Sequence, residues 1–100
     1  MSADFFNSIN LTIQRKSDLL FCHVDDDIVL LDMEAGQYLG FNGVASRIFE
    51  LLSTPQTLNS LCTQLLEEYA ITPENCEAEV KTFLQDLNAK NLLELNPQIV

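Results

Sequence analysis

The residues that could carry chemistry are few and lie far apart in this sequence. Its three cysteines, Cys22, Cys62 and Cys76, are spread along the chain, and His23 is its only histidine. A structural zinc site takes four Cys or His ligands in closely spaced pairs, so we predict no metal site. Each cysteine falls in an apolar stretch, where a free thiol behaves as a small hydrophobic side chain. We therefore expect all three thiols in the core.

A run of aspartates at positions 25–27 could suggest a calcium loop. Such a loop alternates its oxygen ligands and needs a glycine at its sharp bend, and this run has neither feature. Aspartate favours turns because its side chain bonds its own backbone. We interpret the run as a solvated hairpin turn.

The groups of an active site are also missing. The sequence contains no GxSxG, GxGxxG or GxxxxGK[ST] motif, and Gly36, Gly40 and Gly43 are its only glycines. The adjacent acids Glu67 and Glu68 suit a solvated helix surface better than a catalytic cleft. We therefore predict a protein that is not an enzyme and needs no cofactor.

The net charge of the chain excludes some classes of binding partner. Acidic residues outnumber basic ones 15 to 5 among 100 residues, which gives a formal net charge of −10. Such a surface repels phosphate, so we expect neither nucleic acid nor an anionic membrane as a partner. The longest wholly apolar runs are four residues, too short to span a bilayer. With no CxxC and no signal peptide, we expect a cytoplasmic protein.

Alternating apolar residues predict strands in the first half of the chain. Segment 19–24 alternates in this way, segment 28–31 is an apolar run with β-branched residues, and segment 37–41 resembles a third short strand. Tight turns between the three segments predict an antiparallel meander. Residues 11–14 alternate as well, whereas residues 1–10 show no clear period. Both faces of the segment 19–24 are apolar enough for a strand that is covered on both sides.

The second half of the chain has a helical period. Asn42, Thr57 and the pair Thr72-Pro73 each precede an apolar helical stripe and predict three helices. Asn91 suits a left-handed cap after the third. The predicted fold class is α+β and winged helix-turn-helix-like, with a three-stranded antiparallel sheet followed by a three-helix bundle. We expect one domain at 18–95, an N-terminal extension at 1–17 and a tail at 96–100.

The last predicted strand, residues 37–41, would form an edge of the sheet. It has no charge and no proline, the usual devices that protect an edge. One interpretation is that residues 1–10 or 92–95 cover it. The other is that a foreign peptide adds a strand there, with the apolar arc of the third helix as a pocket floor. In that case the acidic flank at Glu79 and Asp86 would favour a basic peptide.

Two blocks of sequence resemble the PqqD-like proteins, which include leader-peptide recognition modules for ribosomally made, modified peptides. The first is LLDMEAGQYLGFNGVASRIFELL at 30–52, and the second is EVKTFLQDLNAKNLL at 79–93. The resemblance covers about residues 18–95 and rests on the order and spacing of the two blocks. Asn91 and Glu79 depart from the family pattern, where Gly and Asp are common, and both changes are chemically tolerable.

The resemblance implies a non-catalytic protein that binds the leader of a precursor peptide and presents it to a peptide-modifying enzyme or a leader peptidase. The leader would dock as an extra antiparallel strand between the third strand and the third helix. Carried over by position, the peptide-binding residues are Gln37, Tyr38, Leu39, Gly40, Cys76, Glu79, Val80 and Phe83. Ordinary core packing is the other interpretation for Val80 and Phe83.

Two alternatives of other classes stay open at this stage. The first is a winged-helix DNA-binding regulator, although the third predicted helix carries more acidic than basic residues. The second is a structural or assembly subunit that pairs through its bare edge. The sequence is compatible with a monomer or a homodimer. A bound leader should carry one or two apolar or aromatic anchors, because main-chain bonds alone give weak affinity.

Overall fold

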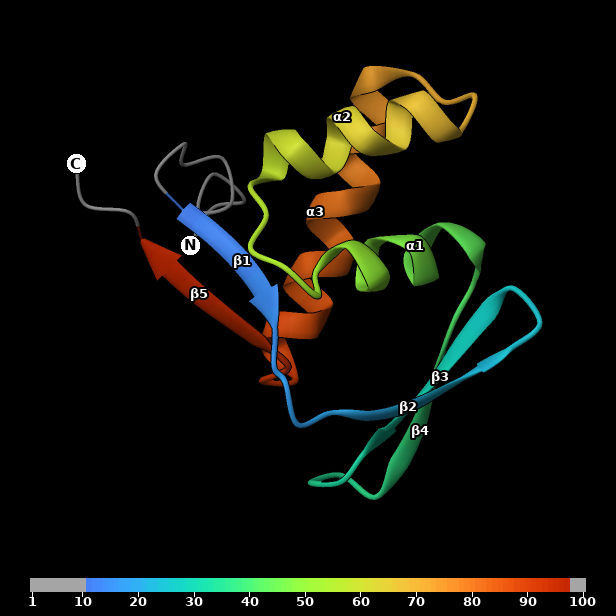
Figure 1. Ribbon diagram of the computed structural model, residues 1–100, viewed down its shortest axis with the longest axis vertical. Coiled ribbons are helices and arrows are strands. Elements are labelled where there is room, and N and C mark those ends of the chain that lie inside the picture. The colour runs from blue at the N-terminus through green and yellow to red at the C-terminus, as the bar shows by residue number, and fades with distance from the viewer. Residues whose placement is uncertain (1–10, 98–100) are drawn as a thin grey trace.

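A three-stranded antiparallel meander forms one end of the molecule in the computed structural model, which describes residues 11–97 (Figure 1). Its strands are β2 (Leu20–Val24), β3 (Asp27–Asp32) and β4 (Gln37–Phe41), with β3 in the centre. All three predicted strands and their antiparallel pairing are confirmed.

The two turns of the meander have local causes. Asp25, in the acidic run, takes a left-handed backbone with φ 57°, and Gly36 does so with φ 65°. The Gly36 N–H donates to the Asp32 carbonyl oxygen over 2.8 Å, and the Ala35 N–H donates to Asp32 Oδ1 over 3.3 Å. Glycine, aspartate and asparagine tolerate this left-handed conformation, which larger side chains avoid.

Three helices follow the meander, as predicted. They are α1 (Gly43–Leu51), α2 (Leu58–Glu68) and α3 (Pro73–Ala89). The predicted caps Asn42, Thr57 and Thr72 each accept a hydrogen bond from a backbone N–H in the first turn. Asn91, just after α3, has φ 61°, so the predicted left-handed cap is confirmed too.

A second sheet corrects the predicted order of elements. Strand β1 (Leu11–Arg15) pairs antiparallel with β5 (Leu93–Pro97), which follows α3. In the sequence, strands therefore come both before and after the helices. The second sheet also pairs residues outside the expected domain of 18–95 with residues inside it. The alternation at 11–14 indicated a strand, but its partner lies about eighty residues away and leaves no local signal.

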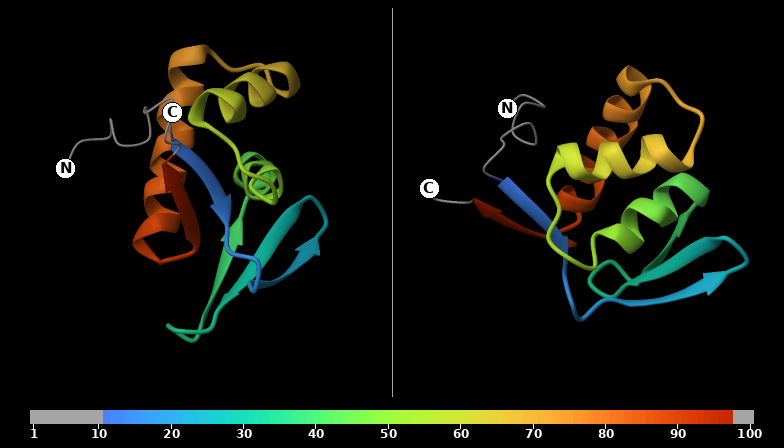
Figure 2. Two further views of the ribbon diagram at one scale, coloured as in Figure 1. Left: turned by 60° about the vertical axis from the view of Figure 1, so that its left-hand side comes forward. Right: turned by 45° about the horizontal axis from the view of Figure 1, so that its top comes forward.

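The helices cover only one face of the three-stranded sheet (Figures 1 and 2). On the inner face, Ile28 and Leu30 are 0% exposed and pack into the core. The opposite face carries Leu20, Val24 and Tyr38, which are 59%, 51% and 75% exposed. The expectation that β2 is covered on both sides is therefore wrong.

Polar contacts hold α1 in place between its neighbours. The Arg47 guanidinium donates to both carboxylate oxygens of Glu68 on α2, over 2.8 and 2.9 Å. These bonds hold the pKa of the Glu68 carboxyl below its ordinary value. His23 Nε2 lies 3.1 Å from Glu50 Oε2 and links β2 to α1. Surface pairs of this kind add little stability; here they link α1 to α2 and to β2.

The thiols should react unequally, because only one is accessible. Cys76 is buried, Cys62 is half-buried and Cys22 is exposed on the open face of β2, so the expectation of three core thiols is wrong for Cys22. Burial, and then the neighbouring Cys76, raise the pKa of Cys62 to about 12. Since the thiolate is the reactive form, Ellman's reagent at mildly alkaline pH should titrate one thiol in the folded protein and all three in denaturant. Rapid reaction of a second thiol before unfolding would contradict this assignment.

Candidate functional site

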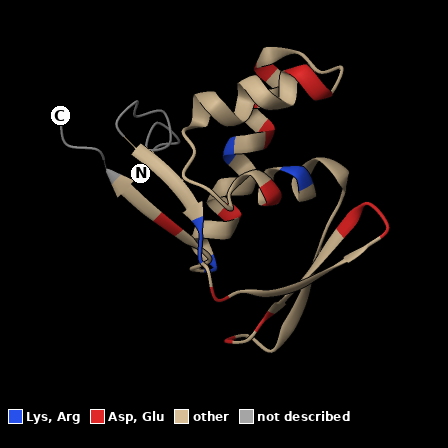
Figure 3. Ribbon diagram, viewed as in Figure 1, with Lys and Arg blue, Asp and Glu red and all other residues tan. Residues whose placement is uncertain are grey.

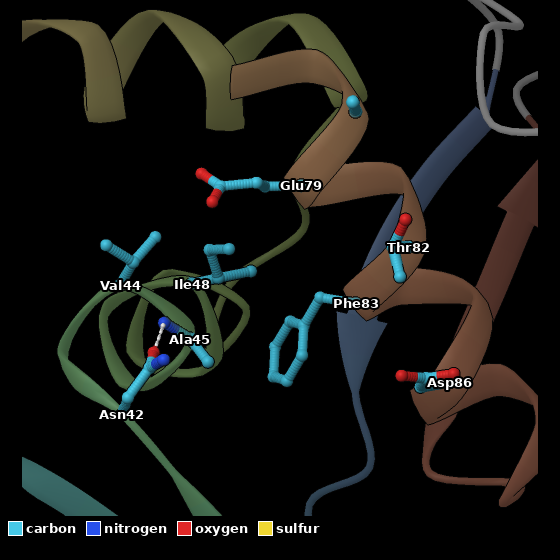
Figure 4. A pocket seen from close by; sticks show the side chains of 9 residues that line it. Asn42, Val44, Ala45, Ile48, Glu79, Thr82, Phe83 and Asp86 are labelled. Carbon is cyan, nitrogen blue, oxygen red and sulfur yellow. Dashed lines mark hydrogen bonds between the residues drawn. The ribbon is translucent and has the colours of Figure 1, made fainter. Parts of the chain in front are cut away.

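A groove runs between β4, the start of α1 and α3. It consists of two adjoining cavities of about 420 and 370 Å³. Both are lined by Asn42, Ala45, Phe83 and Asp86, so they form one continuous groove. Figure 4 shows the first cavity, with side chains of α1 and α3 facing one another across it. The remaining lining residues are Val44, Ile48, Ala78, Glu79 and Thr82 in the first cavity, and Tyr38, Leu39, Gly40, Phe41, Leu87 and Lys90 in the second.

Phe83 stands where the two cavities meet. Its ring packs edge-on against Phe41 with centroids 5.1 Å apart, and Phe41 in turn lies 5.4 Å from Phe49 in the core. Such aromatic pairs add stability beyond the amount that comes from burying their apolar surface. This row of rings connects the groove to the core and supports Phe83 from behind. Phe83 is half-buried, and the part of its ring that stays exposed supplies an apolar surface to the groove.

The opposite wall is the first turn of α1. Asn42 Oδ1 accepts the Ala45 N–H over 3.1 Å and so fixes where the helix begins. Ala45 is the residue of α1 that lines both cavities, and its short side chain leaves space opposite Phe83. A larger side chain at this position would occupy the groove.

The free edge of β4 borders the second cavity. Within residues 11–97, β4 pairs with β3 along one edge and with no strand along the other. The expectation that residues 92–95 might cover this edge is wrong, because residues 93–95 pair with β1 and the Leu92 carbonyl oxygen accepts the Lys16 N–H. The expectation that residues 1–10 might cover it lies outside the described residues. A Cβ added at Gly40 would meet no atom within 4 Å, so the backbone there is approachable from its side-chain direction.

The structure divides the predicted site residues into two groups. Tyr38, Leu39, Gly40, Glu79 and Phe83 line the groove together, whereas Gln37 lies at the start of β4 and lines neither cavity.

Cys76 and Val80 lie in the core, each 0% exposed, and the Cys76 thiol donates to the Cys62 carbonyl oxygen over 3.9 Å. The buried stripe of α3 thus lies next to the stripe that faces the groove. Because both stripes contain apolar residues, the helical period could not separate them.

The wall from α1 was missed by the sequence interpretation. Asn42 was recognised only as a cap, and Val44, Ala45 and Ile48 only as an apolar helix face. The only local signal was alanine at position 45, a small residue within an otherwise bulky stripe. Alanine is too common in helices for this signal to be specific.

The groove region has no metal-binding cluster. Among residues 11–97, no three His, Cys, Asp or Glu side chains gather so that they could hold an ion. In the same part of the chain, no helix has both the length and the apolar character needed to cross a membrane.

Fold and groove together define a class of protein: a small α+β protein in which, over the described residues 11–97, one strand edge is unpaired beside an apolar helical groove. The family model for PqqD, Coenzyme PQQ synthesis protein D, matches residues 27–93. This match covers both walls of the groove, and the chain belongs to the PqqD family. The comparison with curated proteins gives no match.

Solved structures of similar fold include two that contain leader peptides. The structure of TbiB1 in complex with the TbiA(beta) leader peptide has a TM-score of 0.72 and 31% identity, over 81% of this chain and 94% of that one. Lasso peptide synthetase B1 complexed with its leader peptide gives 0.70 and 20%, over 82% and 96%.

A third similar structure comes from Methylobacterium extorquens. It is the solution NMR structure of the PqqD truncation of PqqCD. That truncation represents a functional and stand-alone recognition element for ribosomally synthesized and post-translationally modified peptides (RiPPs). It gives a TM-score of 0.68 and 20% identity, over 83% of this chain and 88% of that one. At 20% identity, this structure and that of lasso peptide synthetase B1 support the fold alone.

Proposed function

We propose that this chain is a non-catalytic recognition element that binds the leader of a ribosomally made precursor peptide. The leader adds to the free edge of β4 as an antiparallel strand and sets one or two apolar side chains against Phe83. The observation that carries this proposal is that, within residues 11–97, β4 has no strand partner along one edge, and this edge borders a groove with the aromatic ring of Phe83 at its centre. The complex of TbiB1 with a leader peptide, at 31% identity, supports it.

The energetics require both parts of the site. An added strand of about five residues forms several main-chain hydrogen bonds, each worth a net of about 0.5–1.5 kcal/mol. Ordering a disordered leader takes back about 2–5 kcal/mol. The main-chain bonds alone therefore leave little affinity. An apolar anchor in the groove supplies the remainder and selects the peptide.

Five predicted residues remain in the proposed binding site: Tyr38, Leu39 and Gly40 on β4, and Glu79 and Phe83 on α3. We add Ala45 and Asp86, because each lines both cavities. Cys76 and Val80 support α3 from the core and do not contact the peptide, and Gln37 flanks the docked strand. The proposed peptide-binding domain is 18–95, extended by the pairing of β1 with β5.

Docking on β4 leaves the rest of the precursor outside the protein. We propose that this exposed part is presented to a peptide-modifying enzyme or a leader peptidase, and that the winged helix-turn-helix-like arrangement serves peptide binding. The chain itself supplies binding and orientation, and the partner enzyme supplies the chemistry.

The proposal is tested by titrating the TbiA(beta) leader peptide into the ¹⁵N-labelled full chain. Backbone amide signals of β4 and of the groove-facing side of α3 should shift, with a micromolar or tighter Kd. Signals of β2, at the other edge of the same sheet, serve as an internal control and should stay in place. An absence of shifts at millimolar peptide, or shifts confined to β2, would refute the proposed function.

A further inference from the structure

The charged side chains of the groove change sign from one end to the other. Glu79 lines the end of the groove formed with Val44 and Ile48. Asp86 lines both cavities, and Lys90 lines only the end beside Tyr38 and Leu39. Lys90 is the one basic residue among the lining residues of the two cavities.

The other basic residues near the groove contact other partners. Arg47 forms an ion pair with Glu68, and Lys81 forms one with Glu77 on the same helix. Strands β2, β3 and β4 contain no Lys or Arg, and both turns of the meander are acidic (Figure 3). The sheet therefore supplies no positive charge to the groove. Lys90, which also lines a neighbouring cavity with Asp32 and Glu34, is the positive group at this end.

We infer that the leader carries a basic side chain on the N-terminal side of its apolar anchor and an acidic side chain on the C-terminal side. This inference rests on the proposed function. Strand β4 runs from the Lys90 end of the groove, next to the turn at Met33 and Glu34, towards the end lined by Val44, which follows the strand in the sequence. An antiparallel leader runs the opposite way and passes Glu79 first and Lys90 last.

Helix and strand geometry give the spacing. From Glu79 to Lys90 the helix advances about 16 Å, which about five residues of strand span. Phe83 lies about 6 Å beyond Glu79, or about two strand residues. Side chains that face the groove recur at every second strand residue. The nearest groove-facing positions therefore give the order basic, then apolar two residues later, then acidic two residues after that. The long, flexible side chain of Lys90 covers the remaining distance of about 3 Å.

The test begins with a selection that presumes no ligand. A random decapeptide display library is selected on the immobilised full chain, and peptides that also bind the Phe83→Asp variant are discarded. The remaining peptides should be enriched in the order basic–apolar–acidic at alternate positions. If no peptide depends on Phe83, the proposed function fails. If such peptides appear with random or reversed charge order, the groove binds peptides but the inferred polarity is wrong.

Two synthetic peptides then measure how strongly the charge order affects affinity. Acetyl-Thr-Lys-Thr-Tyr-Thr-Asp-Thr-amide should bind about tenfold more tightly at low salt than the same peptide with Lys and Asp exchanged. The ratio should shrink at high salt, because exposed ion pairs are screened. In the double variant Glu79→Lys/Lys90→Glu the preference should reverse.

The matched control is Glu67→Lys, which repeats the Glu79→Lys half of this exchange on α2, at a residue that lines neither cavity. It should leave the peptide preference unchanged. Equal binding of the two peptides to the wild-type chain at low salt, or a reversal caused by Glu67→Lys, would overturn the inferred polarity while leaving peptide binding itself intact.

Discussion

Replacing Phe83 by aspartate should weaken leader binding by more than about tenfold, the largest effect expected from any single side chain of the groove. The ring lies at the junction of the two cavities, so an anchor side chain in either cavity would touch it. Aspartate removes this apolar contact. It also adds a negative charge between Glu79 and Asp86, which must be desolvated when the peptide docks. The change in Kd is measured by isothermal titration with the leader peptide.

Loss of folding would imitate this result, because Phe83 also packs against Phe41. Two further variants separate the effects. Ala45→Leu fills the groove from the α1 wall and should weaken binding while Phe83 keeps its contacts. Leu66→Asp places the same charge at an exposed apolar residue of α2 and should leave Kd unchanged. Wild-type affinity in both Phe83→Asp and Ala45→Leu, with folding confirmed by circular dichroism, would remove the groove from the binding site.

The elements that the sequence predicted are those with a local cause. Short apolar runs between turn residues predicted β2, β3 and β4, and side-chain caps predicted the starts of all three helices. Alternation at 11–14 also indicated β1, but the pairing of β1 with β5 has no local cause. The stability of this sheet depends on a pairing between the two ends of the chain and on Ile13, which is 0% exposed. Contacts of such high sequence separation leave no periodic signal.

The proposed binding site also has parts that local sequence predicted and parts that it did not. Its strand edge was predicted, because an uncharged strand without proline is a local property of residues 37–41. Its helical wall was predicted only in part, since Val80 and Phe83 share an apolar arc of α3 and only three-dimensional packing assigns one to the core and the other to the groove. The α1 wall was not predicted at all, because whether a helix face is buried or borders a groove depends on what lies opposite.

Proline at two adjacent positions of β4 should have two different consequences. In an antiparallel pair, neighbouring residues alternate between exchanging hydrogen bonds with the partner strand and directing those groups away from it. Leu39 is opposite Leu30 and Gly40 is opposite Val29, so the two positions are of different kinds. At one of them proline removes a hydrogen bond to β3 and should cost about 1–3 kcal/mol of stability. At the other it leaves the sheet intact and removes a donor that only an added strand would use.

The second of these variants should remain folded yet bind leader at least about tenfold more weakly, because it loses a main-chain bond and introduces a ring where the peptide backbone approaches. Thermal unfolding and peptide titration of Leu39→Pro and Gly40→Pro identify which variant is which. Gly40→Ala is the matched control, since a Cβ at this position meets no atom within 4 Å and the N–H is kept. If both proline variants fold and bind leader as the wild type does, the peptide does not add to β4. Because that outcome would leave the Phe83 result unexplained by strand addition, the two experiments together separate a groove that binds a side chain from an edge that binds a backbone.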